Sequence, residues 1–239
     1  IAGLAPRFRG VQATAVVGVF DLTAASTGAS EKGLRRSGIA DFACVYLHPG
    51  HHANYYPGAT PIHLKVLFSL ETGRILGAQA VGRAGVAKRI DVMATMIQFG
   101  GTVHDMAEAE LCYAPQYGAA KDPVNVAGMI AEHVLSGESP LADWRRVHDT
   151  SALVIDVREP AEYEAGHVPG SVNIPLHVLR KTYAGLPRDR DIWLTCGVGQ
   201  RAYYGVRFLR QHGFPAWNLS GGYTTYKALV GAGILAAKT

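Results

Sequence analysis

The sequence predicts a two-domain protein of the mixed α/β class, and two observations lead to this prediction. The first is a change of pattern at residues 136–140, Ser-Gly-Glu-Ser-Pro, where an expected helix ends and a polar stretch begins. The second is the order of elements: strands and then helices before this point, and an apolar strand, a glycine turn and a helix after it. We therefore place the boundary at about residue 139, which gives domains 1–139 and 140–239.

The first domain is expected to be an α+β unit. Apolar patterning predicts strands at 14–20, 42–47, 62–70 and 74–81. The turn residues Glu71-Thr72-Gly73 join the last two into a hairpin. Helices are expected at 30–36, 86–99 and 123–135. Ser30 is the expected cap of the first helix, and Asp122 followed by Pro123 begins the third.

Cys196 is the strongest candidate for a reactive residue. It follows the apolar run 191–195 and opens a short loop, Gly197-Val198-Gly199-Gln200, which Arg201 closes before a helical segment. Such a strand, turn and helix point backbone N–H groups and a helix N-terminus at one sulfur, which favours the thiolate. The alternative is a buried structural cysteine, but the glycines, the arginine and the following helix favour a reactive one.

The length of the loop limits its chemistry. Four residues separate Cys196 from Arg201. Cysteine phosphatases with this general layout use a longer loop, because a tetrahedral phosphate needs a wider ring of amides. A single sulfur atom on the cysteine, that is, a persulfide, suits the shorter loop better than a phosphate does.

Four motifs of the second domain occur in a characteristic order. They are Asp156-Val157-Arg158, the stretch 166–175 (Gly-His-Val-Pro-Gly-Ser-Val-Asn-Ile-Pro), the Cys196 loop and Asn218-Leu-Ser-Gly-Gly222. Together they resemble a rhodanese (sulfurtransferase) domain. The resemblance implies an α/β domain with a parallel sheet flanked by helices, a transferred sulfur on Cys196, and Arg201 at the far edge of the loop. Gly197 stands where many thiosulfate-using members carry a cation, so a polysulfide or the persulfide of a larger thiol is the expected donor.

The other motif residues are expected to have mainly structural roles. Asp156 and Arg158 follow a strand, and we expect the pair to brace the active-site loop rather than to act in catalysis. His167 has the chemistry of a general base, but we favour a role in fixing its own turn by hydrogen bonds. Gly221 and Gly222 are expected to permit a close backbone approach or a positive φ before the last helix.

Several stretches of the first domain resemble a second module. They are residues 19–28, 52–58, 72–79, 88–91, 113–115 and 120–125. The module is the C-terminal dimerisation domain of flavin-dependent pyridine nucleotide–disulfide oxidoreductases, nearest to the coenzyme A disulfide reductase and NADH oxidase-like group. Some members of that group carry a C-terminal rhodanese domain, which is the arrangement seen here.

This resemblance implies a homodimer with tyrosines near the substrate. Tyr113, with Tyr55 or Tyr56, would approach a disulfide or persulfide across the dimer, where a phenol can donate a proton to a leaving thiolate. Spacing favours Tyr55 without excluding Tyr56, and packing of the interface is the alternative role for these tyrosines. Gln116 replaces the family's usual second proline, and 118–119 is Gly-Ala where serines are common, so the shape of this loop is left open.

The expected cofactors lie outside this chain. The complete enzyme would use FAD, NAD(P)H and coenzyme A, and its FAD- and NAD-binding domains should precede Ile1. Because the chain does not begin with Met, we expect a fragment or a processed product. The stretch Gly82-Arg-Ala-Gly85 is too short, and precedes the wrong segment, for a dinucleotide fingerprint. The sulfur donor and the thiol acceptor are the expected small-molecule partners, and a non-catalytic dimerisation and partner-binding module is the alternative function.

Composition excludes several other classes. With 48% hydrophobic and 18% charged residues the chain is expected to be globular, and no apolar run reaches the length of a membrane span. The net charge of +4 is mild, and the basic residues lack interleaved aromatics, so no nucleic-acid partner is expected. Three scattered cysteines without a Cys-x-x-Cys pair indicate a reducing, cytoplasmic location. No metal site is expected, because His48, His51 and His52 lack a carboxylate or thiol partner and read as a polar surface loop.

Overall fold

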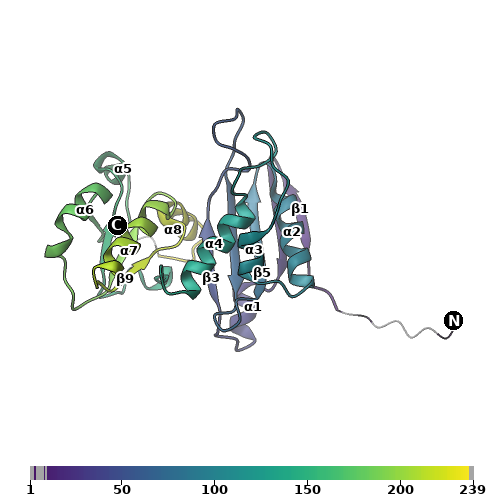
Figure 1. The fold of residues 1–239 in the computed structure, drawn as a ribbon, viewed down its shortest axis with the longest axis horizontal. Coiled ribbons are helices and arrows are strands. Elements are labelled where there is room, and N and C mark those ends of the chain that lie inside the picture. Colours follow the sequence, from purple (N-terminus) through teal and green to yellow (C-terminus); the bar gives the residue numbers. More distant parts are fainter. Residues whose placement is uncertain (1–2, 4–7, 9, 237–239) are drawn as a thin grey trace.

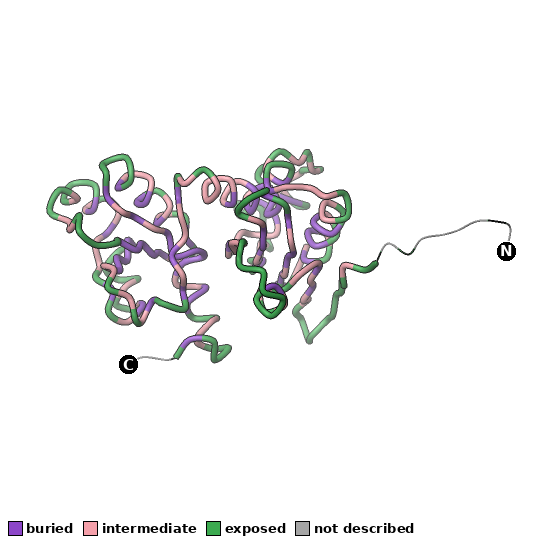
Figure 2. The backbone as a smooth tube through the Cα atoms, turned by 90° about the horizontal axis from the view of Figure 1, so that it is seen from below, coloured by how far each residue is buried: buried purple, intermediate pink, exposed green. Residues whose placement is uncertain are grey.

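The structure is a computed structural model that describes residues 3, 8 and 10–236. It has two units, one built on an antiparallel sheet of five strands and the other on a parallel sheet of four (Figure 1). Buried residues lie in the middle of each unit, and the turns at its periphery are mostly exposed (Figure 2). The predicted mixed α/β class is confirmed.

The first unit contains an antiparallel sheet in the order β1-β2-β5-β4-β3. Its strands are β1 (Ala15–Val19), β2 (Leu22–Gly28), β3 (Ala43–Leu47), β4 (Ile62–Phe68) and β5 (Ile75–Gly82). Its helices are α1 (Glu31–Arg36), α2 (Val86–Gln98), α3 (Val103–Glu108) and α4 (Pro123–Leu135). The expected strands and helices are present, and β2 and α3 are additional.

One face of this sheet forms the core of the unit. Ile62, Leu64 and Val66 of β4 are buried and pack with apolar side chains of α2, α3 and α4. Because side chains alternate along a strand, His63 and Lys65 lie on the opposite face. That face is turned toward the second unit.

Local capping explains where the helices begin. The Ser30 hydroxyl accepts a hydrogen bond from the Gly33 N–H at 3.0 Å, as its position predicts. The Asp122 carboxylate caps α4 by accepting from the Val124 N–H at 3.1 Å. The additional helix α3 begins at Thr102, which forms a capping box with Asp105.

The second unit contains a parallel sheet in the order β7-β6-β8-β9. Its strands are β6 (Leu153–Asp156), β7 (Val172–Asn173), β8 (Ile192–Thr195) and β9 (Ala216–Asn218). Its helices are α5 (Pro160–Glu164), α6 (Leu176–Thr182), α7 (Gln200–Gln211) and α8 (Gly222–Gly231), with 3-10 turns η1 (Trp144–Arg146) and η2 (Tyr183–Gly185). α6 and α7 cover one face, and η1 and α8 cover the other. Helices therefore flank both faces, as expected.

The connection between the units is itself hydrogen-bonded. The Asn218 N–H donates to the Pro140 carbonyl at 2.8 Å, and the Ala142 N–H donates to the Asn218 carbonyl at 3.0 Å. The Tyr46 N–H donates to Ser220 Oγ at 2.8 Å, which ties β3 to the turn before α8. In Figure 1, β3 and α4 lie on the side of the first unit that faces α7 and α8.

None of the helices formed by residues 10–236 combines the length and the apolar character needed to cross a bilayer.

Candidate active site: a buried cysteine loop and an exposed tyrosine pair

Cys196 lies between the end of β8 and the start of α7. Gly199 caps α7 with a φ of 95°, and its N–H donates a hydrogen bond to Cys196 Sγ at 3.2 Å. The residue is only 1% exposed. The predicted strand, glycine turn and helix therefore place a buried sulfur against a backbone amide.

Two glycines at the start of α8 allow the loop to adopt this shape. Gly221 and Gly222 have φ values of 71° and 60°. A Cβ added to Gly222 would lie 2.3 Å from the Cys196 carbonyl oxygen and 2.8 Å from the Gly199 nitrogen. Both predicted properties, the positive φ and the close backbone approach, are confirmed.

The first turn of α8 also holds the cysteine loop by hydrogen bonds. The Tyr223 N–H donates to the Cys196 carbonyl at 2.7 Å, and the Thr224 N–H donates to the Gly197 carbonyl at 3.0 Å. These two amides lie at the start of a helix, where the helix itself provides no acceptor for them. The loop is thus fixed between the beginnings of α7 and α8.

Arg201 is held by a carboxylate that the sequence analysis missed. Its guanidinium donates to both oxygens of Glu162 on α5, at 2.6 and 2.7 Å. This bond lowers the pKa of Glu162 to about 2 and raises the pKa of Arg201. The two residues are 39 positions apart, and no local pattern in the sequence indicates such a pair.

Asp156 and Arg158 form a buried ion pair. Arg158 Nη2 lies 2.6 Å from Asp156 and donates a second bond to the Gly166 carbonyl at 2.7 Å. The guanidinium stacks over the ring of Tyr223 at 4.6 Å, and Tyr223 in turn bonds the Cys196 carbonyl. The pair braces the Gly166 turn directly and is linked to the cysteine loop through Tyr223.

His167 contacts α5. Its Nδ1 lies 3.0 Å from the Tyr163 carbonyl, and its ring stacks on the Tyr163 ring at 3.8 Å. This hydrogen bond ties the turn that contains His167 to the preceding helix.

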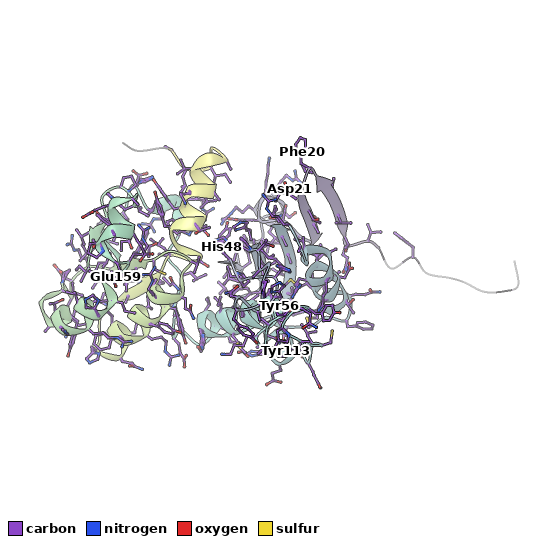
Figure 3. All side chains as sticks on the ribbon, turned by 90° about the horizontal axis from the view of Figure 1, so that it is seen from above. Phe20, Asp21, His48, Tyr56, Tyr113 and Glu159 are labelled. Atoms are coloured by element: carbon purple, nitrogen blue, oxygen red, sulfur yellow. The ribbon has the colours of Figure 1, made fainter. Side chains whose placement is uncertain are left out.

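Tyr55 and Tyr113 form the second candidate site, on the first unit. Their hydroxyls are 2.9 Å apart, and this hydrogen bond raises the pKa of Tyr113. Tyr55 is 77% exposed and Tyr113 is 47% exposed. Tyr56 instead meets the ring of His52 edge-on at 5.7 Å. Of the two adjacent tyrosines, Tyr55 is the one paired with Tyr113. In Figure 3, Tyr56 and Tyr113 lie on the first unit and Glu159 on the second.

Comparison with known protein families assigns both units. Residues 14–122 match the pyridine nucleotide-disulphide oxidoreductase dimerisation domain, and residues 142–229 match the rhodanese-like domain. The chain joins a dimerisation domain of these oxidoreductases to a rhodanese-like domain. Both predicted family resemblances are therefore confirmed.

Individual relatives have the same pairing of domains or part of it. Coenzyme A disulfide reductase of Staphylococcus epidermidis is 38% identical over 125 residues, which cover 52% of this chain and 28% of that protein. The structure of reduced Bacillus anthracis CoADR-RHD is 41% identical with a TM-score of 0.90, over 94% of this chain and 41% of that one. A NAD-dependent persulfide reductase from A. fulgidus is 36% identical with a TM-score of 0.81, over 92% and 40%. This chain spans less than half the length of these relatives.

The tyrosine loops of the dimerisation domain are held together by a buried arginine. Arg89 is 1% exposed, pairs with Asp122 at 2.7 Å and donates to the His51 carbonyl at 2.7 Å. The Ala53 N–H donates to the Gly118 carbonyl at 2.8 Å. These bonds bring the segment of Tyr55 beside that of Tyr113. Arg89 falls in one of the family motifs, yet its position on an amphipathic helix gave no sign that it is buried.

The segment that carries His48, His51 and His52 is not the polar surface loop that was predicted. His52 is 5% exposed and bonds the Ala53 carbonyl at 3.0 Å. His48 lies at the boundary between the domains (Figure 3), 2.8 Å from Thr225 Oγ1 and 2.8 Å from His63 Nδ1. Burial lowers the pKa of His48 to about 4. Within residues 10–236, no three His, Cys, Asp or Glu side chains are grouped to hold a metal ion.

The glycine turn at residues 82–85 does not fit a dinucleotide. It connects β5 to α2, but β5 has only antiparallel neighbours, whereas a dinucleotide fingerprint requires a parallel β-α-β unit.

Proposed function

We propose that the rhodanese-like domain transfers sulfane sulfur through a persulfide on Cys196. The observation that carries the proposal is the hydrogen bond from the Gly199 N–H to Cys196 Sγ at 3.2 Å. A backbone amide and a helix N-terminus stabilise negative charge on sulfur. The loop residues Gly197, Val198, Gly199 and Gln200 would form the binding site for the transferred sulfur, with Arg201 at its edge.

Each step is an exchange at sulfur that neither consumes nor releases electrons overall. The Cys196 thiolate attacks the outer sulfur of a donor persulfide; a new S–S bond forms, the donor's S–S bond breaks, and the donor leaves as a thiolate. An acceptor thiolate then attacks the outer sulfur on Cys196 and takes it as its own persulfide. Cys196 leaves as a thiolate, ready for another donor. A polysulfide donor leaves shortened by one sulfur atom.

Gly197 and the Arg201–Glu162 pair support a polysulfide or a thiol persulfide as the donor. Gly197 adds no positive charge to the loop, and the Glu162 carboxylate neutralises the charge of Arg201 beside it. Strongly anionic donors such as thiosulfate therefore gain little from this site.

In the wider setting, we infer that this step serves a flavin- and NAD(P)H-dependent reductase of coenzyme A disulfide, persulfides or polysulfides. The names of the relatives support this inference, as does the pairing of the two domains. The FAD- and NAD-binding domains would lie outside these 239 residues, and coenzyme A is the expected acceptor thiol. The dimerisation domain would form a homodimer, in the cytoplasm, where the free thiols Cys44, Cys112 and Cys196 stay reduced.

We propose that the Tyr55–Tyr113 pair donates one hydrogen bond to a leaving thiolate at a second site. The bond between their hydroxyls leaves one phenolic proton free to point outward, since only one of the two protons is used between them. Their exposure supports a site completed by a dimer partner or by another domain.

The test of sulfur transfer is intact-protein mass spectrometry after brief treatment with polysulfide, on the native chain and on Cys196→Ser. We expect a gain of about 32 Da, the mass of one sulfur atom, which maps to Cys196 and is removed by a thiol. Cys44 and Cys112 serve as controls within the same molecule. Equal modification of Cys44 or Cys112, with none on Cys196, would contradict the proposal and favour a non-catalytic module for dimerisation and partner binding.

A further inference from the structure

A cleft of about 770 Å³ separates the outer face of the dimerisation-domain sheet from the rhodanese-like domain. Cys44, Tyr46 and Lys65 line it from the sheet, and residues 140–145 and Trp217 line it from the other side. This volume lies in the range of sites for small organic ligands, roughly 300–1,000 Å³. The cleft is built from both domains, and it is separate from the Cys196 loop and the tyrosine pair.

The side chains that line the cleft carry an excess of positive charge. Its cations are Lys32, Arg35, Lys65 and Arg145, and its carboxylates are Glu31 and Asp143. Three of the four cations share Glu31, with N–O distances of 2.9 Å from Arg35, 2.6 Å from Lys65 and 3.7 Å from Arg145. Asp143 pairs with Arg145 alone at 2.6 Å, and Lys32 has no ion pair within residues 10–236. The four cations exceed the two carboxylates by two charges, which a bound dianion would neutralise.

Much of the remaining lining is apolar. It includes Leu70, Leu141, Trp217 and Ile234. The guanidinium of Arg35 lies 5.2 Å from the centre of the Phe42 ring, so a cation and an apolar side chain of the lining meet at this point. A ligand that fills the whole cleft must therefore combine an anionic group with a flat or apolar body.

We propose that this cleft binds an aromatic organic phosphate, with its phosphate beside the cations and its ring against the apolar side chains. A neutral aromatic molecule would leave the excess positive charge without an anion. Inorganic phosphate would leave the apolar wall unfilled. The proposal does not depend on sulfur transfer at Cys196, and it fails or succeeds independently of it.

The experiment is calorimetric titration of the 239-residue chain with adenosine 5′-monophosphate as the probe. We expect saturable binding with a dissociation constant of about 10–1,000 µM, and binding at least about tenfold weaker for adenosine and for inorganic phosphate. Lys32→Glu should weaken binding of the probe about tenfold or more. Lys181→Glu, which makes the same charge change at an exposed position on α6, is the matched control and should leave it unchanged.

Cys44 gives a second measurement of the same site. Its thiol lines the cleft, whereas the exposed thiol of Cys112 does not. Adenosine 5′-monophosphate should slow the reaction of Cys44 with N-ethylmaleimide and leave the rate at Cys112 unchanged, as followed by peptide mass spectrometry. Absence of saturable binding, or equal loss of binding in Lys32→Glu and Lys181→Glu, would overturn the proposal.

Discussion

The Cys196 loop and the tyrosine pair present their reactive groups in opposite ways. Cys196 is 1% exposed and is held by amides of its own domain, whereas Tyr55 and Tyr113 are 77% and 47% exposed. The cysteine site has its supporting contacts within one domain. Among the described residues, the tyrosine hydroxyls form a hydrogen bond with each other and with no other side chain. From this difference we infer that the first site is complete in the chain and that atoms from outside the chain complete the second.

The strongest test of this contrast removes each reactive group in turn. We expect Cys196→Ser to lower the rate of sulfur transfer from polysulfide to a thiol by at least about 10³-fold, because no other group replaces the nucleophile. Tyr55→Phe and Tyr113→Phe should leave the rate in the isolated chain within about twofold of the native value. A comparable loss of rate in either tyrosine variant would contradict this comparison, because that tyrosine would then take part in the reaction of Cys196.

A second test concerns the packing that encloses the cysteine. Gly222→Ala should lower the free energy of unfolding by about 3 kcal/mol, since the added methyl group overlaps backbone atoms and the φ of 60° is strained for alanine. Gly231→Ala, at the other end of α8 where nothing lies within 4 Å of the added carbon, is the control. It should change the free energy by less than about 1 kcal/mol. Urea denaturation measures both, and equal effects would contradict the close packing.

A third test uses acid to probe the ion pair at the edge of the cysteine loop. The pKa of Glu162 is lowered to about 2, so the pair stabilises the fold above the ordinary carboxyl pKa and the stabilisation is lost as the pH falls toward 2. Because Glu162 is 42% exposed, solvent screening limits its contribution to about 0.5–1 kcal/mol. The stability difference between the native chain and Glu162→Gln should therefore be constant near neutral pH and shrink below pH about 4.5.

Glu164→Gln is the matched control for this prediction. Glu164 is exposed on the same helix and has no ion pair within residues 10–236. Thermal unfolding from pH 7 downward should show the narrowing difference for Glu162→Gln and a much smaller change for Glu164→Gln. The same pH profile in both variants would mean that the Arg201 contact has no energetic role.

The smallest expected effect lies in the tyrosine pair. Tyr55→Phe should lower the pKa of Tyr113 toward its ordinary value, because the hydrogen bond that raises it is lost. Ultraviolet absorption during alkaline titration of Tyr55→Phe, with Tyr113→Phe as the reference for assigning the signal, measures the change. Tyr56→Phe should leave the pKa of Tyr113 unaltered, and a shift there instead would make Tyr56 the partner.

The cysteine loop was predictable because its determinants are adjacent in the sequence. The end of β8, the glycine at 199 and the amphipathic α7 follow one another within a few residues. The partners of this loop were only partly predictable: Gly221 and Gly222 occur in a motif, but Glu162 depends on the folded position of α5. The choice between Tyr55 and Tyr56 was likewise not decided by spacing, because it depends on where the loop of Tyr113 lies.

The two elements that the sequence analysis did not predict differ in their cause. α3 carried a signal in the spacing of Thr102 and Asp105, which is a capping box. β2 consists mostly of small residues, Leu-Thr-Ala-Ala-Ser-Thr-Gly, with little intrinsic preference for a strand. It forms a strand because β1 and β5 pair with it on either side, and the pairing with β5 brings together residues far apart in the sequence.

The short connection at residues 140–142 has a consequence for attempts to cut the molecule in two. Its backbone is hydrogen-bonded to Asn218 at the edge of the parallel sheet. It is therefore not the flexible, unpaired segment that a protease needs in order to bind and cleave the chain. Limited digestion of the folded protein should thus leave this joint intact and trim other exposed turns first. A separately produced C-terminal half that starts after Ala142 would lack one lateral neighbour of β9, and its sheet would end in an open edge.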